Sequence, residues 1–403
     1  MKKTKSLWFL ISLFTMGILL FSCQKENINE DFSTVTLKKK VGIELTPMEQ
    51  LGKEIYFDKI SEPNNMGCFT CHGVIAGFTG PNPGINLTSA VYPGAVSTRF
   101  GDRKPPSAAY ATFSPIFHYD ETEGLFVGGN FWDGRATGEK LGNPAADQAQ
   151  GPFLNPVEHN LGSMEEVLAI IAQSKYTDLW EEVWGEPIDY STPDDIGKNY
   201  DRVGLSIAAF EASPEVNQFS SKYDAYLDGM VSLSAEEQLG LTLFEGKGQC
   251  NLCHPSEPGP EGESPLFTDF TFDNLGTPKN PNNPFYDVDP EFIDPGLGGF
   301  LATRPEWVDM IEDNMGKHKV PTLRNVGKAP APGFIKAYMH NGVFKSLKEV
   351  VHFYNTRDVE AWPAPEVADN VNTDELGNLG LTPAEEDAIV AFMMTLSDGY
   401  VIK

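Results

Sequence analysis

Short apolar runs with helical spacing recur along the chain, and several follow a pair of residues typical of helix starts. Thr46 with Glu49 and Ser234 with Glu237 are two such pairs. A Ser or Thr followed three positions later by Glu satisfies the free amide groups of a first helical turn. Strand-like alternation is scarce, so the pattern predicts a mainly α-helical protein. Further helices are predicted around residues 163–171, 205–210, 346–354 and 382–392.

The two capped segments are also copies of one another. Their alignment pairs Leu45 with Leu233, Glu49 with Glu237, Gln50 with Gln238, Leu51 with Leu239, and Gly52 with Gly240. A chain of 403 residues exceeds one ordinary hydrophobic core. We therefore predict two domains, 45–232 and 233–403, with long irregular loops such as 255–300.

The first residues predict export. Three lysines precede an apolar run, Leu7–Phe21, which is too short to cross a bilayer and ends in Leu20-Phe21-Ser22-Cys23. That ending resembles a bacterial lipoprotein signal. We expect residues 1–22 to be removed, Cys23 to carry lipid, and residues 23–44 to be a polar tether. The protein would then be periplasmic or on the cell envelope, held at the membrane by its lipid anchor only.

The charge narrows the class of partner. The formal charge is −27, and removal of residues 1–22 makes it −30, because three lysines and no acidic residue lie there. Such a surface repels nucleic acid and is typical of a soluble exported protein, and it is also compatible with a basic electron donor.

Four of the five cysteines occur in two copies of one motif, Cys68-Phe69-Thr70-Cys71-His72 and Cys250-Asn251-Leu252-Cys253-His254. In C-x-x-C-H, two thiols attach one haem covalently and the histidine binds its iron. A redox dithiol would follow a strand, whereas Gly and Asn precede these pairs. A zinc site built from all four thiols leaves both histidines without a role. We therefore predict two covalently bound c-type haems.

Three further segments complete an ordered set of motifs. They are Phe131-Trp132-Asp133-Gly134-Arg135-Ala136, Pro321-Thr322-Leu323-Arg324-Asn325-Val326 and Tyr338-Met339-His340-Asn341-Gly342. From about Leu45 to Ser397 the chain resembles the bacterial di-haem cytochrome c peroxidases. The resemblance implies two class I cytochrome c-like domains, with a peroxidatic haem in the first and an electron-transfer haem in the second. It also implies reduction of hydrogen peroxide to water with electrons from a small cytochrome c or copper protein. Members of the family often form homodimers.

Individual roles follow from the same resemblance. It implies that His72 and His254 are the proximal haem ligands, Met339 the sixth ligand of the second haem, and Trp132 the tryptophan between the haems. Gln148 and Glu158 resemble the family's distal glutamine and catalytic glutamate. The chemistry agrees with these residue types. A carboxylate can move a proton between the two oxygens of a peroxide, and a neutral amide can donate to a developing anion.

The chain also departs from the family pattern. Tyr110 stands where the family has an asparagine that helps to bind calcium, so calcium is in doubt. His118 and His159 lack the spacing of the family's movable distal histidine, and His318, between two lysines, is expected to face solvent.

Two other functions remain open at this point. Tyr338 beside Met339 fits the related di-haem oxidases that act on a protein side chain during maturation of methylamine dehydrogenase, because those enzymes use a tyrosine ligand. Met315 is an alternative ligand to Met339. A plain electron carrier is the third possibility, but it has no use for a distal acid such as Glu158.

Overall fold

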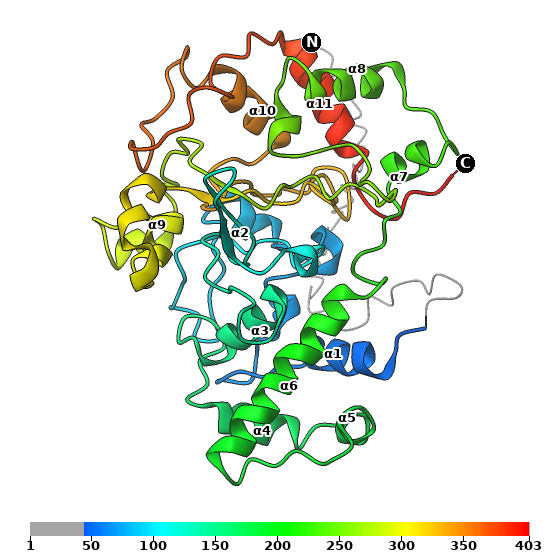
Figure 1. Ribbon diagram of the computed structural model, residues 1–403, viewed down its shortest axis with the longest axis vertical. Helices are drawn as coiled ribbons and strands as arrows, with labels where there is room; N and C mark the ends of the chain where they lie inside the picture. Colours follow the sequence, from blue (N-terminus) through cyan, green and yellow to red (C-terminus); the bar gives the residue numbers. More distant parts are fainter. Residues whose placement is uncertain (1–43, 403) are drawn as a thin grey trace, which may run out of the picture. The chain divides into compact units, whose positions relative to one another are not determined.

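The computed structural model describes residues 44–402, and helices connected by long irregular segments dominate it (Figure 1). The prediction of a mainly α-helical protein is confirmed. The α-helices are α1 (Pro47–Phe57), α2 (Pro83–Leu87), α3 (Pro144–Leu154), α4 (Met164–Ile171), α5 (Thr177–Trp184), α6 (Pro193–Ala212), α7 (Lys222–Leu227), α8 (Ala235–Glu245), α9 (Gly296–Leu301), α10 (Leu347–Thr356) and α11 (Pro383–Met394). The 3-10 helices are η2 (Cys68–Thr70), η3 (Val74–Ala76), η4 (Ala111–Phe113), η5 (Cys250–Leu252), η6 (Pro284–Asp287), η7 (Pro305–Met310) and η8 (Glu312–Asn314).

Strands are short and form two antiparallel pairs within the described residues. Strand β1 (His118–Asp120) pairs with β2 (Leu125–Val127), and β3 (Phe272–Asp273) pairs with β4 (His318–Lys319). The β3–β4 pair joins the long segment after the second cysteine motif to the Pro321 motif. It is one of the contacts that fix the irregular chain in place.

Helix α1 packs against α6 through a close approach of their backbones (Figure 1). Thr46 and Glu49 form the predicted capping box, and Pro47 occupies the first turn, where its missing amide hydrogen costs nothing. A Cβ atom added at Gly52 would lie 1.8 Å from the carbonyl oxygen of Ser206 in α6. Only glycine therefore allows the two helices to approach so closely.

The second copy repeats this arrangement with α8 and α11. Ser234 and Glu237 form the capping box of α8. A Cβ atom added at Gly240 would lie 1.9 Å from the carbonyl oxygen of Ala388 in α11. The internal repeat seen in the sequence thus extends to the way in which each first helix packs on a later one.

Separate groups of buried side chains surround these helix pairs. One includes Leu51, Ile55, Ile207 and Phe210 around α1 and α6, and another includes Phe244, Ile389 and Phe392 around α8 and α11. The described residues, 44–402, form one compact unit. The domain boundary near residue 232 therefore stays a prediction.

The other predicted helices differ in detail. Residues 205–210 lie inside α6, which begins much earlier because Thr192 caps it and Pro193 opens it. Ser163 caps α4, but the Glu166 carboxylate accepts from the amide of Gly162 (2.7 Å) instead of closing a capping box. In the part of the chain that the structure describes, no helix has the length and apolar character to span a membrane. The predicted signal, tether and lipidated Cys23 lie outside this part.

The close helix approach leads to a stability prediction. We expect Gly52→Ala to lower the free energy of unfolding by about 1–3 kcal/mol, because the new methyl group must push α1 away from α6. Gly197→Ala is the matched control, since a Cβ there meets nothing within 4 Å inside the same helix system. That variant should gain up to about 1 kcal/mol from helix propensity. Urea unfolding of the two holoproteins measures both values, and equal effects would contradict the packing argument.

Candidate active site

The first C-x-x-C-H motif lines a cavity of about 240 Å³. Cys68 begins the short helix η2, and the amide nitrogens of Cys71 and His72 both donate to the carbonyl oxygen of Cys68 (3.2 and 2.9 Å). This tight turn directs Cys68, Cys71 and His72 to the same cavity. The two thiols and the imidazole of the motif therefore line the same cavity.

The imidazole of His72 is in the form that binds a metal. Its Nδ1–H donates to the carbonyl oxygen of Phe78 (3.2 Å), which leaves the lone pair on Nε2. Burial also lowers the pKa of His72 to about 4, so the ring is neutral at ordinary pH. Both effects prepare Nε2 of His72 for iron.

The second motif lines another cavity, of about 190 Å³. Cys250 begins η5, and the amide of His254 donates to its carbonyl oxygen (2.9 Å). The Nδ1–H of His254 donates to the carbonyl oxygen of Phe267 (2.8 Å), and burial lowers the pKa of His254 to about 4. The second histidine therefore has the same tautomer and charge state as the first.

The placement of the thiols excludes a single zinc site made from all four. Cys68 and Cys71 line the first cavity, whereas Cys250 and Cys253 line the second. Burial raises the pKa of Cys71 and of Cys250 to about 12. All four are free of disulfides, as covalent attachment to haem requires.

The structure brings Gln148 and Glu158 to the cavity of His72. Gln148 lies on α3, and Glu158 lies in the turn that follows this helix. The backbone of Glu158 is fixed from both sides: its amide donates to Asn155 O (3.0 Å), and its carbonyl oxygen accepts from Ala95 N (2.7 Å). Gln148 and Glu158, which are ten residues apart in the sequence, therefore line the same cavity.

The side chain of Glu158 is partly buried. Burial raises its pKa, although the hydrogen bond from Asn155 Nδ2 to Oε2 (2.7 Å) opposes the shift. A carboxyl group with a raised pKa exchanges protons more readily near neutral pH than an exposed one. Its position and its pKa both suit a proton carrier.

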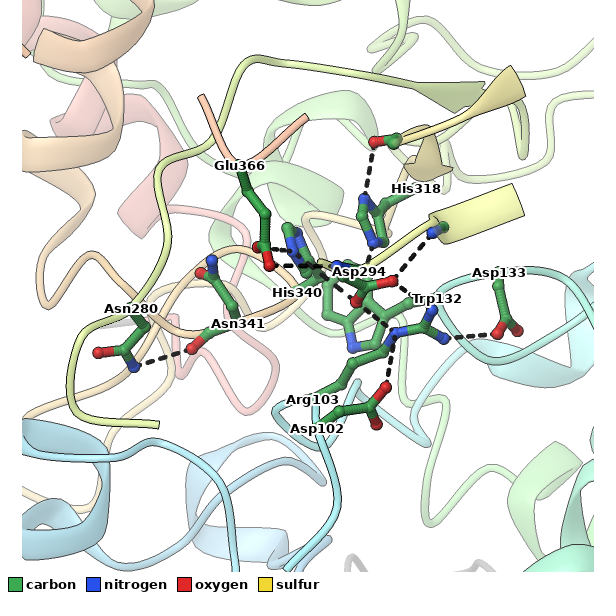
Figure 2. A network of polar contacts seen from close by, with 12 residues as sticks. Asp102, Arg103, Trp132, Asp133, Asn280, Asp294, His318, His340, Asn341 and Glu366 are labelled. Atoms are coloured by element: carbon green, nitrogen blue, oxygen red, sulfur yellow. Dashed lines mark hydrogen bonds and ion pairs between the residues drawn. The ribbon is translucent and has the colours of Figure 1, made fainter. Parts of the chain in front are cut away.

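Trp132 lines both cavities and is buried. Its Nε1–H donates to the carbonyl oxygen of Lys104 (2.8 Å), and the next residue, Asp133, forms an ion pair with Arg103 (2.5 Å). Figure 2 shows Trp132 beside this ion pair. The indole is therefore held rigidly between the two C-x-x-C-H sites.

Two lysines that sequence reasoning did not identify also line both cavities. Burial lowers the pKa of Lys104 to about 8 and that of Lys319 to about 7. Lys319 Nζ donates to Ser114 Oγ (2.6 Å), to Asn130 Oδ1 (3.2 Å) and to the carbonyl of Gly129. Such cations fit the carboxylate side chains that haem carries. Nothing in the sequence distinguishes these lysines from exposed ones.

Met339 and Tyr338 both line the second cavity. Met339 has φ +68°, and Tyr338 donates its hydroxyl to Val326 O (3.3 Å). Burial raises the pKa of Tyr338, which disfavours the phenolate that an iron ligand would have to be. Met315 is not among the lining residues, since it packs against Gly298 of α9.

The prediction that His318 faces solvent is wrong. Strand pairing of β4 with β3 turns the side chain inward, and its ring stacks on His340 at 3.6 Å between ring centres. His118 is exposed, as its position in a surface hairpin requires. His159 is buried and donates from Nδ1 to Ile60 O (2.7 Å). His352 pairs with Glu386 (2.9 Å) on the protein surface side of α10.

Tyr110, at the position where the family asparagine was expected, is buried and donates its hydroxyl to Asp398 Oδ2 (2.7 Å). Its amide donates to Asn217 Oδ1 (2.6 Å). The phenol thus joins an internal hydrogen-bond network.

Comparisons with known proteins define the class. Residues 46–232 match the family model described as di-haem cytochrome c peroxidase. The methylamine utilization protein MauG of Paracoccus denitrificans is 34% identical over 364 residues, covering 86% of this chain and 88% of that protein. The cytochrome-c peroxidase IdrP2 of Pseudomonas sp. strain SCT is 28% identical, covering 87% and 81%. The diheme peroxidase BthA of Burkholderia thailandensis has a similar structure, with a TM-score of 0.73 at 30% identity, covering 88% and 87%.

The two histidine cavities and these comparisons together define a di-haem c-type oxidoreductase. The chain belongs to the di-haem cytochrome c peroxidase family. It carries two c-type haems, and its residues fit them: each cavity has two free thiols and one neutral histidine with an available Nε2.

Proposed function

We propose that the protein reduces hydrogen peroxide to water with electrons from a small redox protein, as a cytochrome-c peroxidase does. The observation that carries the proposal is the wall shared by Glu158, Gln148 and His72 in the first cavity. An acid and an amide in the same cavity as a haem-binding histidine can serve a substrate, whereas a simple electron carrier needs neither.

The protein residues would act on the protons of the reaction. His72 would hold the first haem, and His254 and Met339 would hold the second. The bound haems supply the redox chemistry that breaks the O–O bond. Glu158 would take the proton from the oxygen near the iron and return it to the departing oxygen. Gln148 would donate a hydrogen bond to the charge that develops there, without adding a charge of its own.

Electrons would reach the first cavity through Trp132, which borders both sites. Two electrons and two protons convert one peroxide into two waters. The strongly acidic chain favours a basic donor, such as a small cytochrome c or a copper protein. Attraction between the acidic chain and the basic donor would speed the encounter of the two proteins at low salt.

We also propose that residues 45–232 and 233–403 form a peroxidatic and an electron-transfer domain. The predicted lipid anchor at Cys23, the export of the protein and a homodimer belong to the same proposal. Membership of a c-type cytochrome family supports export.

A second candidate function is oxidation of a side chain in another protein. The 34% identity to the methylamine utilization protein MauG supports it, and so does Tyr338 in the wall of the second cavity. The hydrogen bond from the Tyr338 hydroxyl to Val326 O and the neighbouring Met339 favour the peroxidase instead.

Steady-state turnover tests the proposal. Purified holoprotein with two haems per chain should consume two reduced donor cytochromes for each hydrogen peroxide, continuously and in proportion to enzyme. Donor consumption that stops after one enzyme equivalent would contradict the peroxidase and favour the side-chain oxidase. A haem assay on the same sample ensures that a negative result does not reflect missing cofactor.

A further inference from the structure

A group of titratable side chains outside the roles assigned above lies in the wall of the second cavity (Figure 2). It consists of Asp294, His318, His340 and Glu366, which come from four separate segments of the chain. The possible ligand atoms of Asp294, His318 and His340 all lie within 4.8 Å of one another. We call this group the His-carboxylate cluster.

No hydrogen atom lies between Nε2 of His318 and Oδ2 of Asp294 when the imidazole is neutral. The Nδ1–H of His318 donates to Gly316 O (3.0 Å), so its Nε2 carries a lone pair when the ring is neutral. That Nε2 lies 3.3 Å from Asp294 Oδ2, which is also an acceptor. Burial lowers the pKa of His318 to about 4, so protonation does not resolve the conflict near neutral pH.

His340 and Glu366 show the same deficit. The Nε2 atom of His340 is 4.0 Å from Asp294 Oδ2 and 3.8 Å from Glu366 Oε2, too far for hydrogen bonds. Both side chains are more than nine-tenths buried. Among the described residues, neither this Nε2 nor this Oε2 has a hydrogen-bond partner. Buried polar atoms of this kind normally have a hydrogen-bond partner or bind an ion.

We propose that the His-carboxylate cluster binds one divalent transition-metal cation, with Zn²⁺ as the best-suited ion. Two imidazole nitrogens and two carboxylate oxygens are a ligand set that zinc prefers. At metal–ligand distances of about 2.0–2.1 Å, tetrahedral donors are about 3.3 Å apart. Three of the donor separations are 3.3, 3.8 and 4.0 Å, and the donor atoms of Asp294, His318 and His340 all lie within 4.8 Å of one another. The two imidazole planes are 7° from parallel, so at least one ring must turn out of the stack for both lone pairs to reach one ion.

The local charge favours a cation over an anion such as a haem carboxylate. Arg103 binds Asp294 through two nitrogens, at 2.7 and 2.6 Å, and it also pairs with Asp133. Arg135 also pairs with Asp133, and Asp102 lies 3.9 Å from Arg103. Two guanidinium groups therefore face four carboxylates when Glu366, beside His340, is included. The remaining negative charge would repel an anion and attract a metal ion.

Binding would also tie together distant segments. Arg103 belongs to the first half of the chain, and it meets the cluster through Asp294 in the second half. A cation in the wall of the second cavity would favour the reduced state of the haem held there by His254. We therefore expect the metal to raise the midpoint potential of that haem.

Metal content of the holoprotein provides the test. After incubation with Zn²⁺ and extensive dialysis, elemental analysis should find one zinc for every two haem irons. His318→Gln and Glu366→Gln should each weaken Zn²⁺ binding at least tenfold, with the haem content unchanged. His352→Gln is the matched control, because that histidine lies outside the cluster and should leave zinc binding unaffected.

Two results would overturn the site: no zinc retained above background, or equal retention in wild type and both cluster variants. If zinc is absent while His318→Gln still shifts the potential of the second haem, the cluster contacts a haem carboxylate instead. Peroxide turnover is measured separately, so loss of the zinc site and loss of the proposed peroxidase activity are distinguishable.

Discussion

Replacement of Glu158 by glutamine is expected to lower kcat for hydrogen peroxide by a factor of about 10²–10⁴. Glutamine keeps the size of the side chain and can still accept the hydrogen bond from Asn155, but it cannot carry a proton between the peroxide oxygens. The effect should fall on kcat more than on peroxide binding, since the proton moves during bond cleavage. Stopped-flow mixing of the variant with peroxide measures this step directly.

The pH dependence gives an independent check. Burial raises the pKa of Glu158, so its proton-accepting form is lost at a higher pH than for an exposed glutamate. The wild-type rate should therefore fall as pH decreases through this raised pKa, and the fall should vanish in Glu158→Gln. Glu165→Gln, an exposed acid on α4, is the control and should retain full activity. An unchanged rate in Glu158→Gln would rule out the proposed proton carrier.

The helices were predictable from the sequence because their signals are local. The capping boxes of Thr46, Ser234, Ser346 and Thr382 each involve residues only three positions apart, and all four form in the structure. The start of α6 was missed because Thr192 and Pro193 precede a polar stretch without clear apolar spacing. The capping residues therefore predicted where these helices begin better than the apolar spacing predicted how long they are.

The candidate site was predictable only where a motif marks it. The cysteine motifs, Trp132, Gln148 and Glu158 could be named because ordered motifs accompany them, and these residues line the two cavities. Lys104, Lys319 and His318 could not be named, since their burial depends on contacts far away in sequence. His318 is the clearest case: two neighbouring lysines suggested solvent, whereas pairing of β4 with β3 buries it.

Replacement of Met339 by histidine is expected to lower the midpoint potential of the second haem by tenths of a volt, because axial ligands move haem potentials over roughly 0.8 V. Methionine opposite histidine favours reduced iron, whereas a second histidine does so less. The backbone can accept the change: Met339 has φ +68°, and histidine adopts this left-handed conformation more readily than most residues. Potentiometric titration of the two haems measures the shift.

Met315→Leu is the control for this variant, because Met315 packs on Gly298 and does not line the second cavity. It should leave both potentials unchanged. An unaltered potential in Met339→His would remove Met339 as the ligand and direct attention to Tyr338, whose hydroxyl would then have to leave Val326 O and lose its proton. Burial raises the pKa of Tyr338, so the iron would have to stabilise the phenolate for Tyr338 to act as a ligand. A lowered potential together with slower reduction by the donor would instead establish the second haem as the entry point for electrons.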